Sequence, residues 1–271
     1  MIKAKNILKK DDVLQGVYDR WQYIMLAVAI FLAIVFCCYY IITQSKWGFY
    51  TSGAAKIQTM TGDVKPAAEK RAYLTFDDGP SHNTMEILDI LDANNVKATF
   101  FVVGKDESYY ECYRQIVKRG HTLGLHSYSH DYDRIYAGLH EFVEDIEELQ
   151  KLLYDVTGVE CVYYRFPGGS SNTVARTDMG ELISYVDSKG LIYFDWNALN
   201  NDAVCGSYTP EQLVDNIMKD AVQHDDVVIL MHDLDSRHTT VESLQLLIDE
   251  LRDKGYELLP IDESTPLVRH R

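Results

Sequence analysis

The chain is poor in positive charge. Among its 271 residues, 26 are Lys or Arg and 41 are Asp or Glu, which gives a formal net charge of -15 at pH 7. A protein that binds nucleic acid needs a basic face to meet the phosphates. The composition therefore argues against a nucleic-acid partner, and we interpret most of the acidity as a solvated surface.

Cysteine is also scarce, with five residues in the chain. Cys37 and Cys38 lie in an apolar run, whereas Cys112, Cys161 and Cys205 are scattered without the spacing of metal ligands. Five cysteines in a chain this long do not make a disulfide scaffold. A disulfide between Cys161 and Cys205 is one possibility, and the cysteine content does not decide between an oxidising and a reducing compartment.

One segment contains no charged residue. Residues 23–42 read YIMLAVAIFLAIVFCCYYII, and at about 1.5 Å per residue a helix of this length matches the roughly 30 Å core of a bilayer. Tryptophan and tyrosine residues stand near both ends, where their rings favour the membrane interface. A buried core helix is the alternative, but an uncharged run of this length is uncommon there. We therefore predict a transmembrane anchor over residues 21–45.

The charges that flank this segment predict its orientation. Five basic residues precede it, and three lysines follow within about 20 residues. The positive-inside rule then places the N-terminus in the cytoplasm and the large C-terminal part outside the cell, on a single-pass membrane protein. A cleaved signal peptide fits less well, because the run is too long. The predicted organisation is a cytoplasmic tail over 1–20, the anchor over 21–45, a linker over 46–70 and one large domain over 71–265.

From residue 71 onward, short β-rich runs alternate with longer helical stretches. Seven such alternations predict a parallel α/β fold, either an open sheet or a barrel. In both architectures, functional residues gather at the C-terminal ends of the strands. The predicted strands are Ala72–Asp77, Ala98–Val103, Thr122–His126, Tyr163–Phe166, Ile192–Asn197, Val227–His232 and Glu257–Ile261.

Several helix ends can also be predicted. Asn83, three residues before Glu86, and Thr209-Pro210, just before Gln212, have the pattern of helix starts. Three glycines each follow a lysine or arginine and precede a predicted strand, which is typical of a helix C-terminus with a left-handed cap. These glycines are Gly120, Gly190 and Gly255.

Polar residues follow the first and third predicted strands. Asp77 and Asp78 end the first strand, before Gly-Pro, and could supply a metal ligand and a base, although an ordinary turn is the alternative. The third strand runs into His126 and His130. Histidines at i and i+4 share one face of a helix and could share one metal, but two exposed loop histidines would have the same spacing.

The later strands end in polar residues too. Arg165 ends the fourth and could hold a carboxylate through a bidentate pair, and the Pro-Gly-Gly after it exposes N–H groups that could receive an oxyanion. Random placement rarely puts so many ionisable residues on one rim, so their agreement predicts a functional site. The residues at predicted strand ends are Asp77, Asp78, His126, His130, Arg165, Asp195 and His232.

With these motifs, residues 71–262 resemble the polysaccharide deacetylase family, the family 4 carbohydrate esterases. The resemblance implies a distorted (β/α)7 barrel, which here would follow one transmembrane helix. The motifs that carry it are, in order, TFDDGP at Thr75–Pro80, HSYSH at His126–His130, RFPGG at Arg165–Gly169, FDWNALNNDA at Phe194–Ala203 and LMH at Leu230–His232.

The resemblance also implies roles for the metal site and the base. Asp78, His126 and His130 would hold one divalent metal, zinc in the usual case, with cobalt and nickel as alternatives. Asp77 would be the general base, and Arg165 would orient it.

It implies further roles around the substrate. His232 would be the general acid, the Gly168 N–H would help form the oxyanion hole, and Leu230 would line the pocket for the acetyl methyl group.

The fourth motif departs from the commonest family form. A leucine stands where an aspartate is usual near its middle, and Ala203 takes the place of its final tryptophan. Asp195 and Asp202 are therefore both candidates to orient His232. Trp196 is the candidate for the missing aromatic wall of the substrate groove.

The expected activity is hydrolysis of the N-acetyl amides of an extracellular polysaccharide, with release of acetate. An anchor at the outer face favours the cell-wall glycan, peptidoglycan N-acetylglucosamine. Chitin oligomers, another exopolysaccharide, acetylated xylan and a small cyclic amide are alternative substrates. Two histidines and one carboxylate also suit a ferrous oxygenase, and a non-catalytic sugar-binding protein or a membrane scaffold is a further alternative. Asp77 and His232 together favour hydrolysis.

Overall fold

A computed structural model describes residues 70–204 and 208–271, which form most of a compact unit, Pro66–Arg271. The predicted tail and anchor and nearly all of the predicted linker fall on residues 1–69 and lie outside the described residues. In the described part of the chain, no helix is both long and apolar enough to cross a bilayer.

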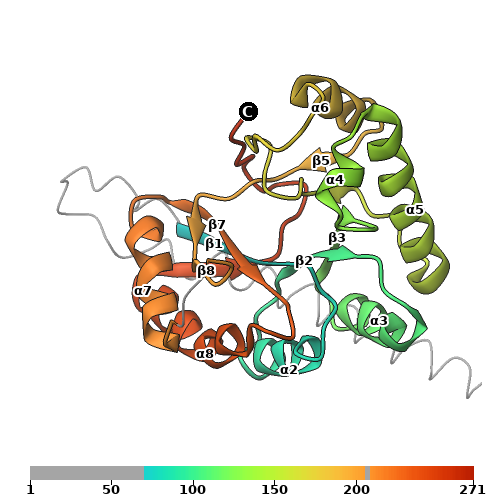
Figure 1. Ribbon diagram of the computed structural model, residues 1–271. Coiled ribbons are helices and arrows are strands. Elements are labelled where there is room, and N and C mark those ends of the chain that lie inside the picture. The colour runs from blue at the N-terminus through green and yellow to red at the C-terminus, as the bar shows by residue number, and fades with distance from the viewer. Residues whose placement is uncertain (1–69, 205–207) are drawn as a thin grey trace, which may run out of the picture. The chain divides into compact units, whose positions relative to one another are not determined.

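Eight parallel strands form one curled sheet (Figure 1). Their order is β5-β4-β3-β2-β1-β7-β6, and β8 pairs with β1 as well. The strands are β1 Lys70–Asp77, β2 Thr99–Val103, β3 Thr122–Ser127, β4 Tyr163–Tyr164, β5 Ile192–Tyr193, β6 Ala198–Leu199, β7 Asp226–His232 and β8 Tyr256–Leu259.

Helices cover the outside of the curl (Figure 1). The 3₁₀ turn η1, Glu107–Tyr109, leads into α3. The α-helices are α2 Thr84–Ala93, α3 Tyr110–Lys118, α4 Tyr132–Ile135, α5 Leu139–Thr157, α6 Met179–Ser188, α7 Pro210–Ala221 and α8 His238–Asp253.

The predicted strand over Ile192–Asn197 is too long. Only its first two residues form a strand, β5, and the rest of the segment leads to the separate strand β6. The two short strands lie at opposite ends of the strand order. The backbone leaves β5 because the N–H of Asp195 donates to Val268 O at 2.8 Å, and that of Asn197 donates to Val228 O at 3.1 Å. Within the described residues no ladder joins β5 to β6, so the predicted barrel is a curled half-barrel with an open side.

The helix ends follow the sequence closely, with one exception. Thr209 and Gln212 form the predicted capping box at the start of α7, and Gly120, Gly190 and Gly255 all have positive φ. Asn83 occupies the N-cap of α2 without capping it. Its side-chain amide donates instead to the carbonyl of Leu234 at 2.7 Å.

The alternation of side chains along the strands positions the site. In β1, Ala72, Leu74 and Phe76 pack against the helices in the main core. The intervening residues point into the curl, and one of these is Asp77. Asp77 is the register partner of His232 on β7, so both lie at the same mouth. A small inner core fills the curl beneath them, formed by Tyr73, Phe101, Phe194, Val228 and Ile261.

The last six residues, 266–271, lie beyond the predicted domain boundary at 265 but pack against the same sheet. Besides the Val268 contact with Asp195, the N–H of His270 donates to Asp195 Oδ2 at 2.7 Å. Cys161 is buried with a free thiol, and Cys205 lies outside the described residues.

Candidate active site

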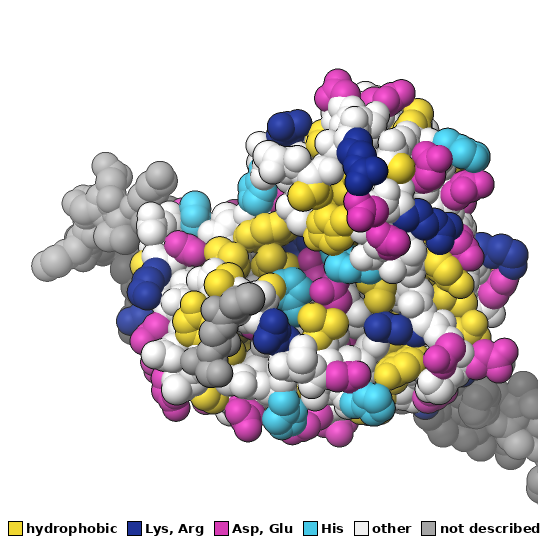
Figure 2. Space-filling model, in the orientation of Figure 1, with side chains coloured by type: hydrophobic (Ala, Val, Ile, Leu, Met, Phe, Trp, Pro, Cys, Tyr) yellow, Lys and Arg dark blue, Asp and Glu magenta, His cyan; other side chains and the backbone are white. Residues whose placement is uncertain are grey.

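A cavity of about 410 Å³ opens at the C-terminal ends of the central strands. Figure 2 shows histidine and acidic side chains gathered at the centre of one face, bordered by hydrophobic ones. The cavity holds eight of the residues predicted from the sequence. Its lining consists of Asp77, Asp78, His126, His130, Tyr132, Gly168, Trp196, Ala203, Leu230, His232, Leu234 and Arg237.

Asp78, His126 and His130 form a cluster whose ligand atoms all lie within 4.8 Å of one another. A helix is not what brings the two histidines together. His126 lies in β3, whereas His130 follows in a turn with φ 50°. This turn places the two imidazole rings 5.3 Å apart, so the chain reaches the same pairing without helical geometry.

The donor atoms of this cluster suit a divalent metal. Asp78 Oδ1 lies 3.4 Å from His126 Nε2 and 3.0 Å from His130 Nε2, yet it is buried and accepts no well-oriented hydrogen bond. A cation at this point would satisfy that oxygen. His126 Nδ1 lies 2.8 Å from the carbonyl of Arg165, which holds the proton on Nδ1 and directs the Nε2 lone pair into the cluster.

The same surroundings set the charge of Asp78. Burial alone would raise the pKa of this carboxyl group. The close approach of the His126 and His130 imidazoles outweighs that effect and holds the pKa of Asp78 well below its ordinary value. Asp78 is therefore ionised, as a metal ligand must be.

Asp145 of α5 holds the turn that carries His130. Its buried carboxylate accepts hydrogen bonds from the N–H of Tyr128 at 2.8 Å and of Ser129 at 2.9 Å. It also accepts from both serine hydroxyls of the turn, at 2.6 Å each. Ser127 Oγ in turn accepts from the N–H of His130 at 2.8 Å. The second histidine is thus placed by a helix that contributes nothing else to the cavity.

Arg165 lies fully buried beneath Asp77. One Nη1–H donates to Asp77 Oδ1 at 2.9 Å, a single hydrogen bond rather than the bidentate pair expected from the sequence. The other donors of the guanidinium are engaged, because Nη1 also reaches Thr75 Oγ1 while Nε and Nη2 donate to backbone carbonyls of residues 194 and 195. Asp77 Oδ2 is left facing the metal cluster, 3.9 Å from His126 Nε2.

Asp202 contacts His232, and Asp195 does not. Asp202 Oδ1 lies 2.6 Å from His232 Nδ1, and Oδ2 accepts from the His232 N–H and from Thr240 Oγ1. Burial lowers the pKa of His232, but the hydrogen bond and charge of Asp202 outweigh it and raise the pKa to about 9. Asp195 instead accepts from the N–H and hydroxyl of Ser170, because the chain turns its carboxylate toward the loop after β4.

That loop provides the candidate oxyanion donor. Gly168 and Gly169 have φ values of 74° and 80°, a conformation that favours glycine. The N–H of Gly169 donates to Phe166 O, and that of Ser170 to Asp195. Gly168 is the residue of this loop that lines the cavity, together with Trp196 and Leu230 on the other walls.

Comparison with known proteins agrees with this geometry. A family model described as polysaccharide deacetylase matches residues 64–183. A peptidoglycan-N-acetylglucosamine deacetylase of Bacillus cereus is 32% identical over 205 residues, which cover 72% of this chain and 71% of that protein. The chain belongs to the polysaccharide deacetylase family.

Solved structures of related proteins have the same fold as this deacetylase. The catalytic domain of a peptidoglycan N-acetylglucosamine deacetylase from Eubacterium rectale has 37% sequence identity and a TM-score of 0.72, over 80% of this chain and 98% of that one. The polysaccharide deacetylase Bc1974 from Bacillus cereus has 29% identity and a TM-score of 0.66, over 74% and 97%. The deacetylase is accordingly a hydrolase that acts on amide bonds, in a metal-dependent family.

Sequence reasoning missed several residues of this deacetylase's cavity. Tyr132, Leu234 and Arg237 line it, and no spacing rule marks them, since each lies in a segment that follows a strand rather than at the strand's end. Tyr132 packs edge-on against His130 at 5.5 Å. Burial and the nearby carboxylates of the cluster raise the pKa of Tyr132 to about 12, so its hydroxyl keeps its proton.

Asp233 was also missed, although it follows His232 directly. It is fully buried and accepts hydrogen bonds from Ser81 Oγ and Thr84 Oγ1, and burial raises its pKa to about 6. Gly79 allows this approach, since a Cβ at that position would collide with the Asp233 carboxylate. Asp233 thereby fixes the loop that presents Asp77 and Asp78.

Proposed function

We propose that this chain is a metal-dependent deacetylase of the N-acetylglucosamine residues of peptidoglycan. The observation that supports this most directly is that Asp77 and His232 line the same cavity as the Asp78–His126–His130 cluster. A base, an acid and a metal site within one cavity are what hydrolysis of an unactivated amide requires.

The metal site would consist of Asp78, His126 and His130, with zinc as the expected ion. A divalent ion held by these three residues would supply Lewis-acid chemistry, which lowers the pKa of a water molecule toward neutrality and polarises a carbonyl group. Asp77 accepts the proton of the attacking water through Oδ2, because Arg165 engages its other oxygen.

The remaining steps belong to the other walls of the cavity. The Gly168 N–H donates to the carbonyl oxygen as negative charge develops on it. His232 donates its Nε2 proton to the departing sugar nitrogen, since Asp202 occupies the Nδ1 side. Leu230 contacts the acetyl methyl group and Trp196 the sugar ring. The products are acetate and a free amino sugar.

The substrate and the location are proposed together. The relatives from Bacillus cereus and Eubacterium rectale bear the name of peptidoglycan N-acetylglucosamine deacetylases. We propose that residues 21–45 anchor this chain in the cell membrane, with the N-terminus cytoplasmic and the catalytic domain outside. An enzyme so placed stays within reach of the wall glycan.

Acetate release tests the proposal. The purified full-length chain, loaded with zinc, is incubated with peptidoglycan and with N-acetylglucosamine oligomers, beside an Asp77→Asn control. We expect acetate from peptidoglycan at a rate well above that of the control. Faster release from the oligomers would favour chitin fragments as the substrate, and no release from either would contradict the proposal.

A further inference from the structure

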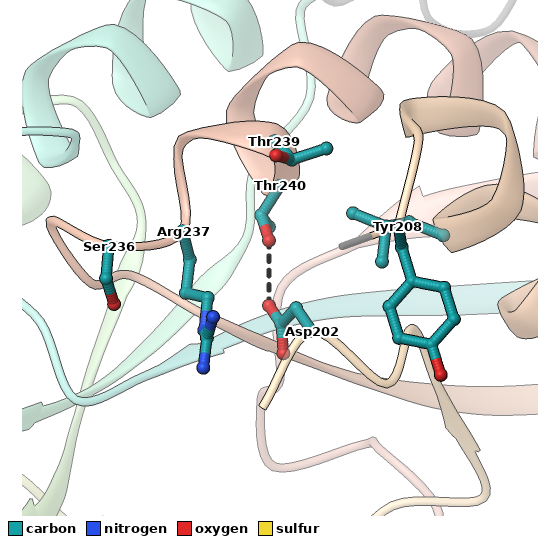
Figure 3. A pocket seen from close by; sticks show the side chains of 7 residues that line it. Asp202, Tyr208, Ser236, Arg237, Thr239 and Thr240 are labelled. Carbon is teal, nitrogen blue, oxygen red and sulfur yellow. Dashed lines mark hydrogen bonds between the residues drawn. The ribbon is translucent and has the colours of Figure 1, made fainter. Parts of the chain in front are cut away.

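A second, smaller cavity of about 140 Å³ adjoins the catalytic one. Its lining includes Ser236, Arg237 and Thr239 at the start of α8, with Asp202 and Tyr208 opposite (Figure 3). Arg237 lines both cavities, so its guanidinium group marks the point where they meet.

Arg237 differs from the other arginine near the reaction centre. Arg165 is bonded to Asp77 and to three further acceptors. Arg237, in contrast, forms no ion pair with any described residue, and its Nε is buried from solvent without an acceptor. A buried N–H without a partner is unfavourable, and such groups commonly mark a place that a ligand fills.

Asp202 and the two aspartates close to Arg237 in the sequence, Asp233 and Asp235, are engaged elsewhere. Asp202 accepts from His232 and Thr240, and Asp233 is buried with its own hydroxyl donors. Asp235 is exposed and lies 2.9 Å from His82 Nδ1. The guanidinium of Arg237 is therefore available to form an ion pair with a ligand.

A small side chain lies beside Asp202, which lines the second cavity. Ala203 follows Asp202 and lines the catalytic cavity near His232. An acetylated sugar that reacts beside His232 would thus bring its substituents, or those of the next sugar, close to Arg237.

We propose that Arg237 binds a carboxylate on the glycan next to the reacting N-acetyl group, as found on the lactyl ether of a muramic acid residue that carries no stem peptide. A carboxylate accepts from Nε–H and one Nη–H side by side, which satisfies the buried donor. Ser236 and Thr239 add hydroxyl donors, and the start of α8 favours negative charge. This inference rests on the proposed function and narrows its substrate to carboxylated glycans.

Two tetrasaccharides of equal length test the inference on the full-length enzyme. One contains only N-acetylglucosamine, and the other alternates N-acetylglucosamine with N-acetylmuramic acid bearing free carboxylates. We expect Arg237→Gln to lower the ratio of kcat/KM for the charged over the neutral substrate at least tenfold, mainly through KM. Conversion of the carboxylates to methylamides should lower the wild-type ratio similarly. Arg237→Lys, which keeps the charge but not the fork, should fall between.

Arg252→Gln is the matched control, because it removes the same charge near the far end of α8, where Arg252 donates to the Asn94 carbonyl. The ratio of kcat/KM for the charged over the neutral substrate should be the same in this variant as in the wild type. An unchanged ratio in Arg237→Gln would overturn the inference while leaving deacetylation intact. If the wild type releases no acetate from either substrate, the proposed function fails. In that case calorimetry tests the inference separately, by measuring the Kd of each enzyme for the two tetrasaccharides. An equal Kd of wild type and Arg237→Gln for the charged tetrasaccharide would overturn the inference.

Discussion

At the scale of single residues, the site depends on two adjacent carboxylates with different neighbours. Asp77→Asn keeps the shape of the side chain but cannot accept a proton. It should retain the metal and lose about 10²–10⁴-fold in turnover. Asp78→Asn removes a charged ligand, so it should weaken metal binding, and added zinc should partly restore its rate. Metal content and acetate release at several zinc concentrations distinguish the two. Zinc rescue of Asp77→Asn alone would show that the roles are reversed.

His232 supplies a prediction about pH. As a general acid it must be protonated, so turnover should fall as the pH rises through its pKa, which Asp202 raises to about 9. Asp202→Asn removes that charge and should lower the pKa, which shifts the alkaline limb of kcat/KM to lower pH. The full pH profile of both enzymes measures this. An alkaline limb that stays in place would separate Asp202 from the protonation of His232.

Some residues of the site could be predicted from the sequence, and others could not. Asp77, Asp78, His126, His130, Arg165 and His232 could be predicted because strand ends of a parallel sheet meet at one mouth. The choice between Asp195 and Asp202 could not, because it depends on which way the chain turns between β5 and β6. Arg237 and Asp145 lie outside every strand-end pattern, and only the packing of α8 and α5 brings them to the site.

At the scale of elements, α5 supports the metal site through one side chain. Asp145→Ala removes the acceptor of four hydrogen bonds that shape the turn before His130. We expect the zinc affinity to fall about 10–100-fold, the usual effect of losing a residue that supports a metal ligand. Zinc titration measures the affinity, and excess zinc should restore much of the activity. Unchanged zinc affinity in a folded Asp145→Ala protein would show that the turn holds its shape alone.

Helix α7 offers a prediction about stability alone. Thr209→Ala removes the side chain that accepts from Gln212 N–H in the capping box. The free energy of unfolding should fall by about 1 kcal/mol, which denaturant unfolding measures. Thr209 does not line the catalytic cavity, so acetate release at 25 °C should stay at the wild-type rate.

The sequence predicts the long strands of the sheet better than the short ones. The long central strands β1, β2, β3 and β7 agree with the sequence to within one or two residues, because each is a mostly buried, largely apolar run. The predicted strands at Tyr163–Phe166 and Ile192–Asn197 shrink to two residues each. Arg165 donates to the carbonyls of Phe194 and Asp195, and the Asp195 N–H donates to Val268 O, contacts that no local sequence pattern predicts.

At the scale of the whole molecule, the proposed orientation predicts which side of the membrane carries the domain. In a cysteine-free background, a cysteine introduced by Asp63→Cys should react with a membrane-impermeant thiol reagent in intact cells. The expectation rests on the uncharged segment and the basic residues before it. A cysteine at Lys9, on the other side of the segment, should react only after lysis. The reverse pattern would make a wall substrate untenable.

The central position of β1 has a consequence for synthesis. This strand leaves the ribosome first among the eight, yet two of its neighbours, β7 and β8, are the last. Arg71 and Asp226, which meet across β1 and β7, stand 155 positions apart in the chain. Loops of that length close slowly, and the pairs of β1 with β7 and β8 cannot form before translation has produced these last two strands. We expect the sheet to stay incomplete until its final strands emerge, and an incompletely folded chain is the form that a translocation channel can thread.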